Sequence, residues 1–219
     1  ASSSGLFASF LPKPLQNTPG SGLHLAVSIT KNGKNLFHPS FEESEEGQQF
    51  IAGVLRRAAE MTIFGNPLTN SFQRLGEFIA AYITWSHQNR APLITVPLAT
   101  GGKPNRFKLR SFDGCINPYI VFALLIHAGL DGIEDKLTLA PACTENLFTA
   151  SEAVRAKYDA LPGSLCDAIR LAQNSEFIAK YLPEKMRTAF FAAKQAEHDR
   201  IALADDRTAA ERQLYFERY

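Results

Sequence analysis

The sequence predicts an α+β fold in which an antiparallel sheet is followed by a helical C-terminal region. Residues 1–115 contain short runs of high β-propensity separated by glycine and proline turns. From residue 116 onward the apolar residues recur with a helical period. Strands first and helices after is the order of an α+β chain. The 219 residues are enough to bury a real core, in one large domain or two small ones.

Several segments of the first half have the composition of strands. Asn32 and Gly33 form a dipeptide typical of a hairpin turn between the first two of these segments. Gly101 and Gly102 mark a turn between the last two. We therefore expect strands at residues 22–30, 35–37, 82–85, 93–98 and 106–112.

Helices are expected from the apolar period and from their capping residues. In the first half, Phe50, Ile51 and Val54 lie on one stripe and predict a helix over about residues 48–61. Asn117 is a good N-cap and Pro118 a good first helical residue. The remaining helices are expected at 118–130, 146–157, 164–173, 175–182 and 184–218, the last broken near residues 205–206.

Composition and charge exclude several classes of function. The formal net charge of +1 provides no global field that would recruit nucleic acid or an anionic membrane. No apolar stretch reaches the roughly 18–20 residues of a membrane helix. Three widely spaced cysteines argue against a disulfide framework or a zinc site, and we expect a reducing, cytoplasmic setting. The start has neither an initiator Met nor a signal peptide, so we expect a fragment or a processed product.

A row of cations is the most informative feature of the residues alone. Strand alternation over residues 106–110 predicts that Phe107 and Leu109 face the core. Arg106, Lys108 and Arg110 then share the opposite face. Two interpretations remain open: a solvated sheet face whose cations pair with carboxylates, or a cradle for phosphate or carboxylate groups.

Other candidate residues are individually weak. Arg74 and Arg90 lie in polar, turn-rich segments, where an arginine is more often a surface residue than a ligand. Gly20 begins a glycine-rich turn that leads to His24 at the start of a strand. Small residues allow close approach of the backbone to a ligand, but a lone histidine is more often structural.

Taken in order, these segments resemble the glutamine synthetase family over nearly the whole chain. The matching motifs are Phe10-Leu11-Pro12-Lys13-Pro14, Gly20-Ser21-Gly22-Leu23-His24, Phe50-Ile51-Ala52-Gly53-Val54-Leu55, Asn66-Pro67, Asn70-Ser71 with Arg74-Leu75, Trp85 to Arg90, Asn117-Pro118-Tyr119, and Leu161-Pro162-Gly163-Ser164. Any one of these motifs could be chance, whereas the ordered series is specific.

The resemblance implies that residues 1–219 are the C-terminal portion of a glutamine synthetase catalytic domain, without the N-terminal β-grasp domain. Members of the family phosphorylate glutamate with ATP, and ammonia then displaces phosphate from γ-glutamyl phosphate. The implied cofactors are ATP and Mg²⁺ or Mn²⁺, the implied substrates glutamate, ammonia and ATP, and the implied assembly a homo-oligomeric ring. Because family sites form between neighbouring subunits, we expect this segment alone to be inactive.

The resemblance also implies roles for individual residues. It assigns His24 to a metal, Gly20 to the glutamate-binding loop, Arg74 and Arg110 to glutamate or phosphoryl contacts, Arg90 to the phosphate, and Arg106 to the nucleotide. Glu77 is the nearest candidate for the acid that deprotonates ammonium. Its register is uncertain, and an exposed loop acid is an equally good interpretation.

Departures from the family pattern suggest an altered site. Lys108 stands where the family strand has a metal-binding acid, and an ammonium cannot coordinate a cation. Ala26 stands in place of a histidine, Pro19 in place of an asparagine and Thr95 in place of an arginine. Our hypothesis is that one metal site is weakened or lost and that the ammonium partly replaces it. A catalytically impaired homologue and a γ-glutamyl-amine ligase remain alternatives.

Overall fold

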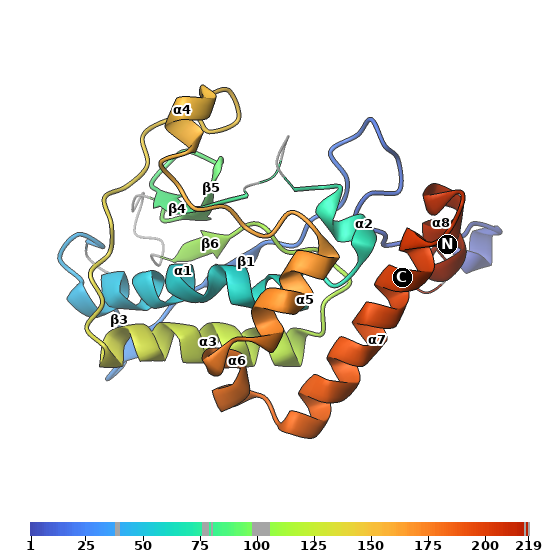
Figure 1. Ribbon diagram of the computed structural model, residues 1–219. Coiled ribbons are helices and arrows are strands. Elements are labelled where there is room, and N and C mark those ends of the chain that lie inside the picture. The colour runs from blue at the N-terminus through green and yellow to red at the C-terminus, as the bar shows by residue number, and fades with distance from the viewer. Residues whose placement is uncertain (38–39, 76–78, 80, 98–105, 217, 219) are drawn as a thin grey trace.

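The structure is a computed structural model of residues 1–219 and describes all of them except 38–39, 76–78, 80, 98–105, 217 and 219 (Figure 1). A four-stranded sheet has the order β1-β6-β5-β4. Its strands are β1 (Leu25–Val27), β4 (Tyr82–Ser86), β5 (Pro92–Thr95) and β6 (Phe107–Leu109). The predicted α+β class is confirmed. The predicted strand at 93–98 is shorter in the structure, where β5 ends at Thr95, and its last residue, Leu98, lies outside the described residues.

Pairing in the sheet is mixed. β6 runs antiparallel to both of its neighbours, β1 and β5, as the prediction of an antiparallel sheet requires. β4 instead pairs with β5 in parallel, which departs from that prediction. The predicted strand at 22–30 divides into β1 and β2 (Thr30–Lys31), and β2 pairs with β3 (Lys34–Asn35). Asn32 and Gly33 have φ angles of 52° and 76°, so the predicted hairpin turn is confirmed.

One long helix packs against the sheet, and a second lies along that helix. α1 (Glu45–Gly65) packs against the strands, with the Phe50 ring 6.0 Å from that of Phe107, and α3 (Pro118–Glu134) lies along α1 (Figure 1). α1 begins earlier than predicted because the Ser44 side chain accepts a hydrogen bond from the Gly47 N–H. The helices approach closely at Gly53, where an added Cβ would lie 2.1 Å from a carbonyl oxygen of α3.

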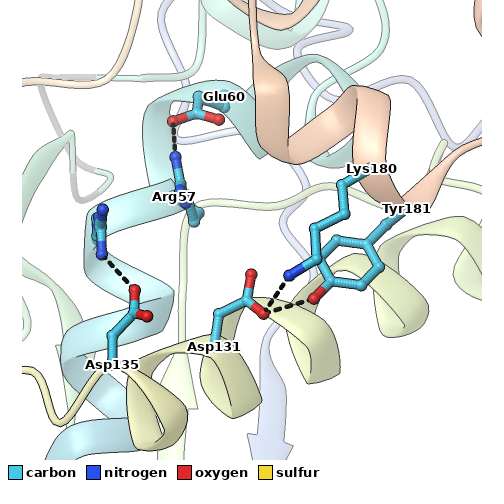
Figure 2. A network of polar contacts seen from close by, with 7 residues as sticks. Arg57, Glu60, Asp131, Asp135, Lys180 and Tyr181 are labelled. Atoms are coloured by element: carbon cyan, nitrogen blue, oxygen red, sulfur yellow. Dashed lines mark hydrogen bonds and ion pairs between the residues drawn. The ribbon is translucent and has the colours of Figure 1, made fainter.

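Polar contacts join these helices to α6 (Glu176–Tyr181). Figure 2 shows Asp131 of α3 accepting hydrogen bonds from Lys180 and from the Tyr181 hydroxyl. Arg57 pairs with Glu60 within α1, at 3.0 Å. Because such pairs lie near the surface, each contributes about 1 kcal/mol or less. Apolar packing therefore carries most of the association between α1, α3 and α6.

The C-terminal region is helical, as predicted. It contains α4 (Glu152–Arg155), α5 (Leu165–Gln173), α6, α7 (Glu184–Ala202) and α8 (Arg207–Tyr215). The predicted break between the last two helices is confirmed, and Asp206 caps α8. The predicted helix at 146–157 is wrong in its first part. There the Asn146 side chain accepts a hydrogen bond from the Phe148 N–H and forms a turn instead.

Two short helical segments complete the fold. A 3₁₀ turn, η1, spans Ser2–Ser4. α2 spans Thr69–Phe72 and lies between α1 and β4 in the chain. α7 leads to α8, which lies near both chain ends (Figure 1). A second apolar cluster there joins Leu11, Leu68, Ile201 and Tyr215. This cluster ties the N-terminal segment and the start of α2 to the two C-terminal helices. In the described part of the chain, no helix has the length and apolarity needed to cross a membrane.

Candidate active site

The outer face of β6 carries the predicted cations. Phe107 and Leu109 are buried in the core, at 0% and 2% exposure, which confirms the alternation expected from the sequence. Lys108 and Arg110 point to the opposite face and are half-buried. Arg106 is exposed and directly precedes β6.

Three residues that the resemblance marks as departures from the family pattern form one row across the sheet. Lys108 is paired with Ala26 of β1 on one side and with Thr95 of β5 on the other. Paired residues on adjacent strands share a face of the sheet. The row Ala26–Lys108–Thr95 is therefore a local feature of this face. In the sequence, Lys108 is more than 80 positions from Ala26 and 13 positions from Thr95.

Arg110 contacts a residue on each side of it, Thr95 of β5 and His24 next to β1. Its Nε donates a hydrogen bond to Thr95 Oγ1 at 2.9 Å. Its Nη1 lies 3.5 Å from His24 Nδ1, a long contact in which the guanidinium is the donor. Thr95 is buried. An arginine in its place would put a second positive charge next to Arg110, whereas the Thr95 hydroxyl is neutral. Nothing in the residue pattern marks Thr95 as a partner of Arg110.

The electrostatic environment of His24 shows which predicted residues converge. Partial burial lowers the pKa of this imidazole, and nearby positive charges lower it further, in the order Arg110, Lys108, Arg74 and Arg90. Burial also lowers the pKa of Arg110, with Arg90 as the second cause. The four cations and His24 thus share one region of the molecule. In the part of the chain that the structure describes, no hydrogen bond or ion pair joins Arg106 to this group.

Arg74 has spare hydrogen-bonding capacity in a buried position. It is 2% exposed, and its Nη2 donates to Asn66 Oδ1 at 3.1 Å and to the Ser111 carbonyl oxygen. Its Nε and Nη1 have no partner among the described residues. Burial lowers the pKa of Arg74, and the negative charge of Asp113 opposes that effect. Because unpaired buried donors are costly, these two N–H groups need an acceptor that the described residues do not supply.

The glycine-rich turn lies against this guanidinium. A Cβ added to Gly22 would lie 2.9 Å from Arg74 Nη1, so a side chain there would displace the guanidinium. Gly20 has a φ of +81°, and an added Cβ would lie 2.3 Å from the Pro12 carbonyl oxygen. The N–H of Ser21 donates to that same oxygen at 2.7 Å. Glycine is thus required at position 20 by the backbone, whereas at position 22 it leaves room for the end of the Arg74 side chain.

The described residues do not fit a complete metal site. They include no cluster of three or more His, Cys, Asp or Glu side chains that could hold a cation. His24 is the one predicted ligand on this face, its Nδ1 faces Arg110, and Lys108 adds a positive charge nearby. Any further ligands would have to come from outside these residues. Glu77, predicted as a catalytic acid, lies outside the described residues.

Comparison with known proteins identifies the family. Residues 1–215 match the model of the glutamine synthetase catalytic domain. Glutamine synthetase from Methanosarcina mazei is 38% identical over 202 residues, which cover 89% of this chain and 45% of that protein. Glutamine synthetase from Thermus thermophilus is 39% identical over the same length, with the same coverage of both chains.

Solved structures agree with this match. The apo form of the protein GmaS superposes with a TM-score of 0.81 at 31% identity, and covers 97% of this chain and 49% of its own. A complex of GmaS with ADP gives a TM-score of 0.80 at 30% identity, covering 97% of this chain and 50% of its own. The fold of this chain, a mixed sheet backed by helices, thus matches about half of each of these two solved chains.

The chain belongs to the glutamine synthetase family, and it corresponds to that family's catalytic domain. This supports a ligase as the kind of enzyme. The chain spans about half the length of the curated relatives that it matches.

Proposed function

We propose that the full-length protein is an ATP-dependent ligase that joins ammonia to the side chain of glutamate through γ-glutamyl phosphate. The observation that carries this proposal is that Arg110 contacts His24 and that Arg74 and Arg90 also lie close enough to lower the pKa of this imidazole. Phosphoryl transfer is catalysed mainly by positioning and by compensation of charge, which is what clustered guanidinium groups provide. The complex of the related GmaS with ADP supports nucleotide binding by this fold.

The geometry supports a division of roles among these residues. Arg74, with two buried unpaired donors beside the Gly20 turn, would bind a carboxylate of glutamate. Arg90 and Arg110 would bind the transferring phosphoryl group, and Arg106 the nucleotide. Glu77 remains the proposed acid that deprotonates ammonium.

The proposed divalent cation would neutralise phosphate charge, and His24 would be its ligand from this part of the chain. Lys108 stands beside it and would supply a fixed positive charge on the same face. We therefore propose that the site uses one metal ion fewer than the family pattern implies. The row Ala26–Lys108–Thr95 supports this proposal, because all three of its members depart from that pattern together.

The remaining ligands and the rest of the substrate cavity would come from the other half of the protein and from neighbouring subunits of a homo-oligomeric ring. The three cysteines are free, in keeping with the cytoplasmic setting proposed for the enzyme. The 219 residues alone would accordingly not turn over.

The test is ADP release by the full-length protein. We expect release to require both glutamate and an amine, either ammonia or hydroxylamine. Arg110→Met should reduce the rate by about 100-fold or more, because it removes a charge-assisted contact to the transferring group. Arg170→Met on α5 is the matched control, since the one ion pair of that arginine with a described residue is with Asp167 on the helix surface. ADP release that does not depend on glutamate would refute the proposal.

The amine acceptor is tested in the same assay. If ammonia supports turnover at lower concentration than methylamine or ethylamine does, the enzyme makes glutamine. A preference for an alkylamine would assign it instead to the γ-glutamyl-amine ligases. Binding of ATP without turnover of any amine would identify an impaired homologue.

A further inference from the structure

A buried carboxylate on the C-terminal helix contacts the segment that leads to Arg74. Glu211 of α8 is 7% exposed. Its Oε1 accepts a hydrogen bond from the Thr69 hydroxyl at 2.6 Å. Its Oε2 accepts bonds from the side-chain amides of Asn70 at 3.2 Å and Gln73 at 2.8 Å. One carboxylate thus binds three side chains along α2 and its C-terminal end.

α2 has little stability of its own. It spans only the four residues Thr69–Phe72, and a single helical turn does not persist without tertiary contacts. Gln73 ends this turn, and Arg74 follows it directly. The direction in which the Arg74 side chain leaves the backbone therefore depends on where Glu211 holds α2.

The same carboxylate is linked to the glycine-rich turn. Asn70, one of its partners, also pairs with the backbone of Lys13: its Oδ1 accepts from the Lys13 N–H at 2.7 Å, and its Nδ2 donates to the Lys13 carbonyl at 3.0 Å. Pro12, the preceding residue, accepts the hydrogen bond from Ser21. A continuous series of contacts thus runs from Glu211 both to the segment that carries Arg74 and to the glycine-rich turn packed against it.

We propose that Glu211 is a positioning residue for the substrate carboxylate. It fixes α2 and the glycine-rich turn relative to each other, and so holds the unpaired N–H groups of Arg74 in the geometry for binding. This inference rests on the proposed function for the identity of the ligand, glutamate. A carboxylate accepts from all three partners with a full negative charge, whereas an amide offers one neutral oxygen and must turn its NH₂ group toward the Thr69 hydroxyl, so the hydrogen bonds to Asn70 and Gln73 lose their charge assistance.

The decisive variant in the full-length protein is Glu211→Gln. We expect the KM for glutamate to rise about tenfold, because a neutral amide weakens the charge-assisted hydrogen bonds that hold α2. The KM for ATP and kcat should change by less than about threefold, because the hydrogen bonds of Glu211 support a binding group rather than the phosphoryl group. Gln73→Ala removes one donor from an exposed position, and should raise the KM for glutamate by a smaller factor without risk to folding.

A matched control separates positioning from general loosening of α8. Asp206 caps this helix by accepting a hydrogen bond from the Ala209 N–H at 3.0 Å, and it makes no contact with α2 among the described residues. Asp206→Ala should lower thermal stability while leaving the KM for glutamate unchanged. In the double variant Glu211→Gln with Gln73→Glu, the amide at position 211 can donate to the carboxylate at position 73, which reverses the wild-type hydrogen bond. This variant should recover part of the lost affinity for glutamate.

Hydrogen exchange provides a readout that does not depend on activity. Glu211→Gln should speed exchange of the backbone amides of residues 69–74, and Asp206→Ala should leave them as in the wild type. If these amides respond but no glutamate-dependent ADP release exists, the proposed function fails and the positioning role stands. Equal effects of both variants on KM or on exchange, or a folded Glu211→Gln protein with an unchanged KM for glutamate, would overturn the inference.

Discussion

Lys108 can be tested by changing its charge in two steps, to Gln and then to Glu. If the Lys108 ammonium replaces a metal ion, removing its charge should raise the affinity of this face for a divalent cation. Reversing the charge should both attract the cation and provide a carboxylate ligand. Metal affinity should therefore rise in the order Lys, Gln, Glu.

The register of the sheet sets the size of the effect. Because Leu25 pairs with Leu109 and Ala26 with Lys108, His24 and Lys108 are diagonal neighbours on one face. Such neighbours lie about 7 Å apart. For a half-exposed group, with an effective dielectric constant of about 40 to 80, an ammonium repels a divalent ion at that distance by about 1 to 2 kcal/mol. Lys108→Gln should remove this repulsion, and Lys108→Glu should shift metal binding by about twice as much, or roughly 30- to 1,000-fold in Kd.

Calorimetric titration of the full-length protein with Mn²⁺ is the assay. We expect the wild type to lack one tight site that Lys108→Glu gains, and Lys108→Gln to show tighter binding at an intermediate level. Lys34→Glu makes the same change of charge on the separate β2–β3 hairpin and should alter nothing. The reasoning is refuted if the wild type already holds two tight Mn²⁺ ions per chain, or if Lys34→Glu reproduces the gain.

Three further predictions concern folding and reactivity. Gly53→Ala should lower the free energy of unfolding by about 1 to 3 kcal/mol, because its methyl group would overlap α3, whereas Gly163→Ala has no atom within 4 Å and should be nearly neutral; urea denaturation compares them. Burial raises the pKa of Asp113 above its usual 3.8, so the folded state keeps this proton at a higher pH than the unfolded chain does. The free energy of unfolding of the wild type should therefore rise relative to that of Asp113→Asn as the pH falls through the raised pKa toward 3.8. Urea denaturation at several pH values measures this difference, and a difference that falls as the pH falls would contradict the prediction. Burial raises the pKa of the Cys115 thiol to about 12. Iodoacetamide at about pH 8 should therefore alkylate the exposed Cys166 before Cys115, and mass spectra that show equal labelling of the two would contradict this.

Much of the fold was predictable because its signals are local. The capping of the helix at Asn117, the hairpin at Asn32 and the break before Asp206 each depend on a few adjacent side chains. α2 was missed because four residues show no helical period, and its position depends on Glu211, far along the chain. The parallel pairing of β4 with β5 was missed for the same reason, since strand direction within a sheet depends on tertiary structure.

The candidate site was predictable in composition but not in its contacts. Resemblance to the family pointed to Arg74, Arg90, Arg110 and His24, and the structure brings these four together. The burial of Arg74 was not predicted, because a polar, turn-rich segment usually lies at the surface. Its partner Asn66 had a signal in the sequence, since it opens a matched motif, whereas the Ser111 carbonyl is a backbone group that no motif marks.

We propose that the departures inferred from the resemblance to the family are one exchange. Replacing an acid by Lys108 raises the charge of the row by two units, and having Thr95 in place of an arginine lowers it by one. An arginine at Thr95 would face both Lys108 and Arg110, and like charges on adjacent strands are destabilising. The neutral hydroxyl instead accepts a hydrogen bond from Arg110 and allows Lys108 to remain beside it. This coupling predicts that Thr95→Arg is tolerated better with Lys108→Glu than alone. A double-mutant cycle on the unfolding free energy measures it, and additivity within about 0.5 kcal/mol would show that the two positions changed independently.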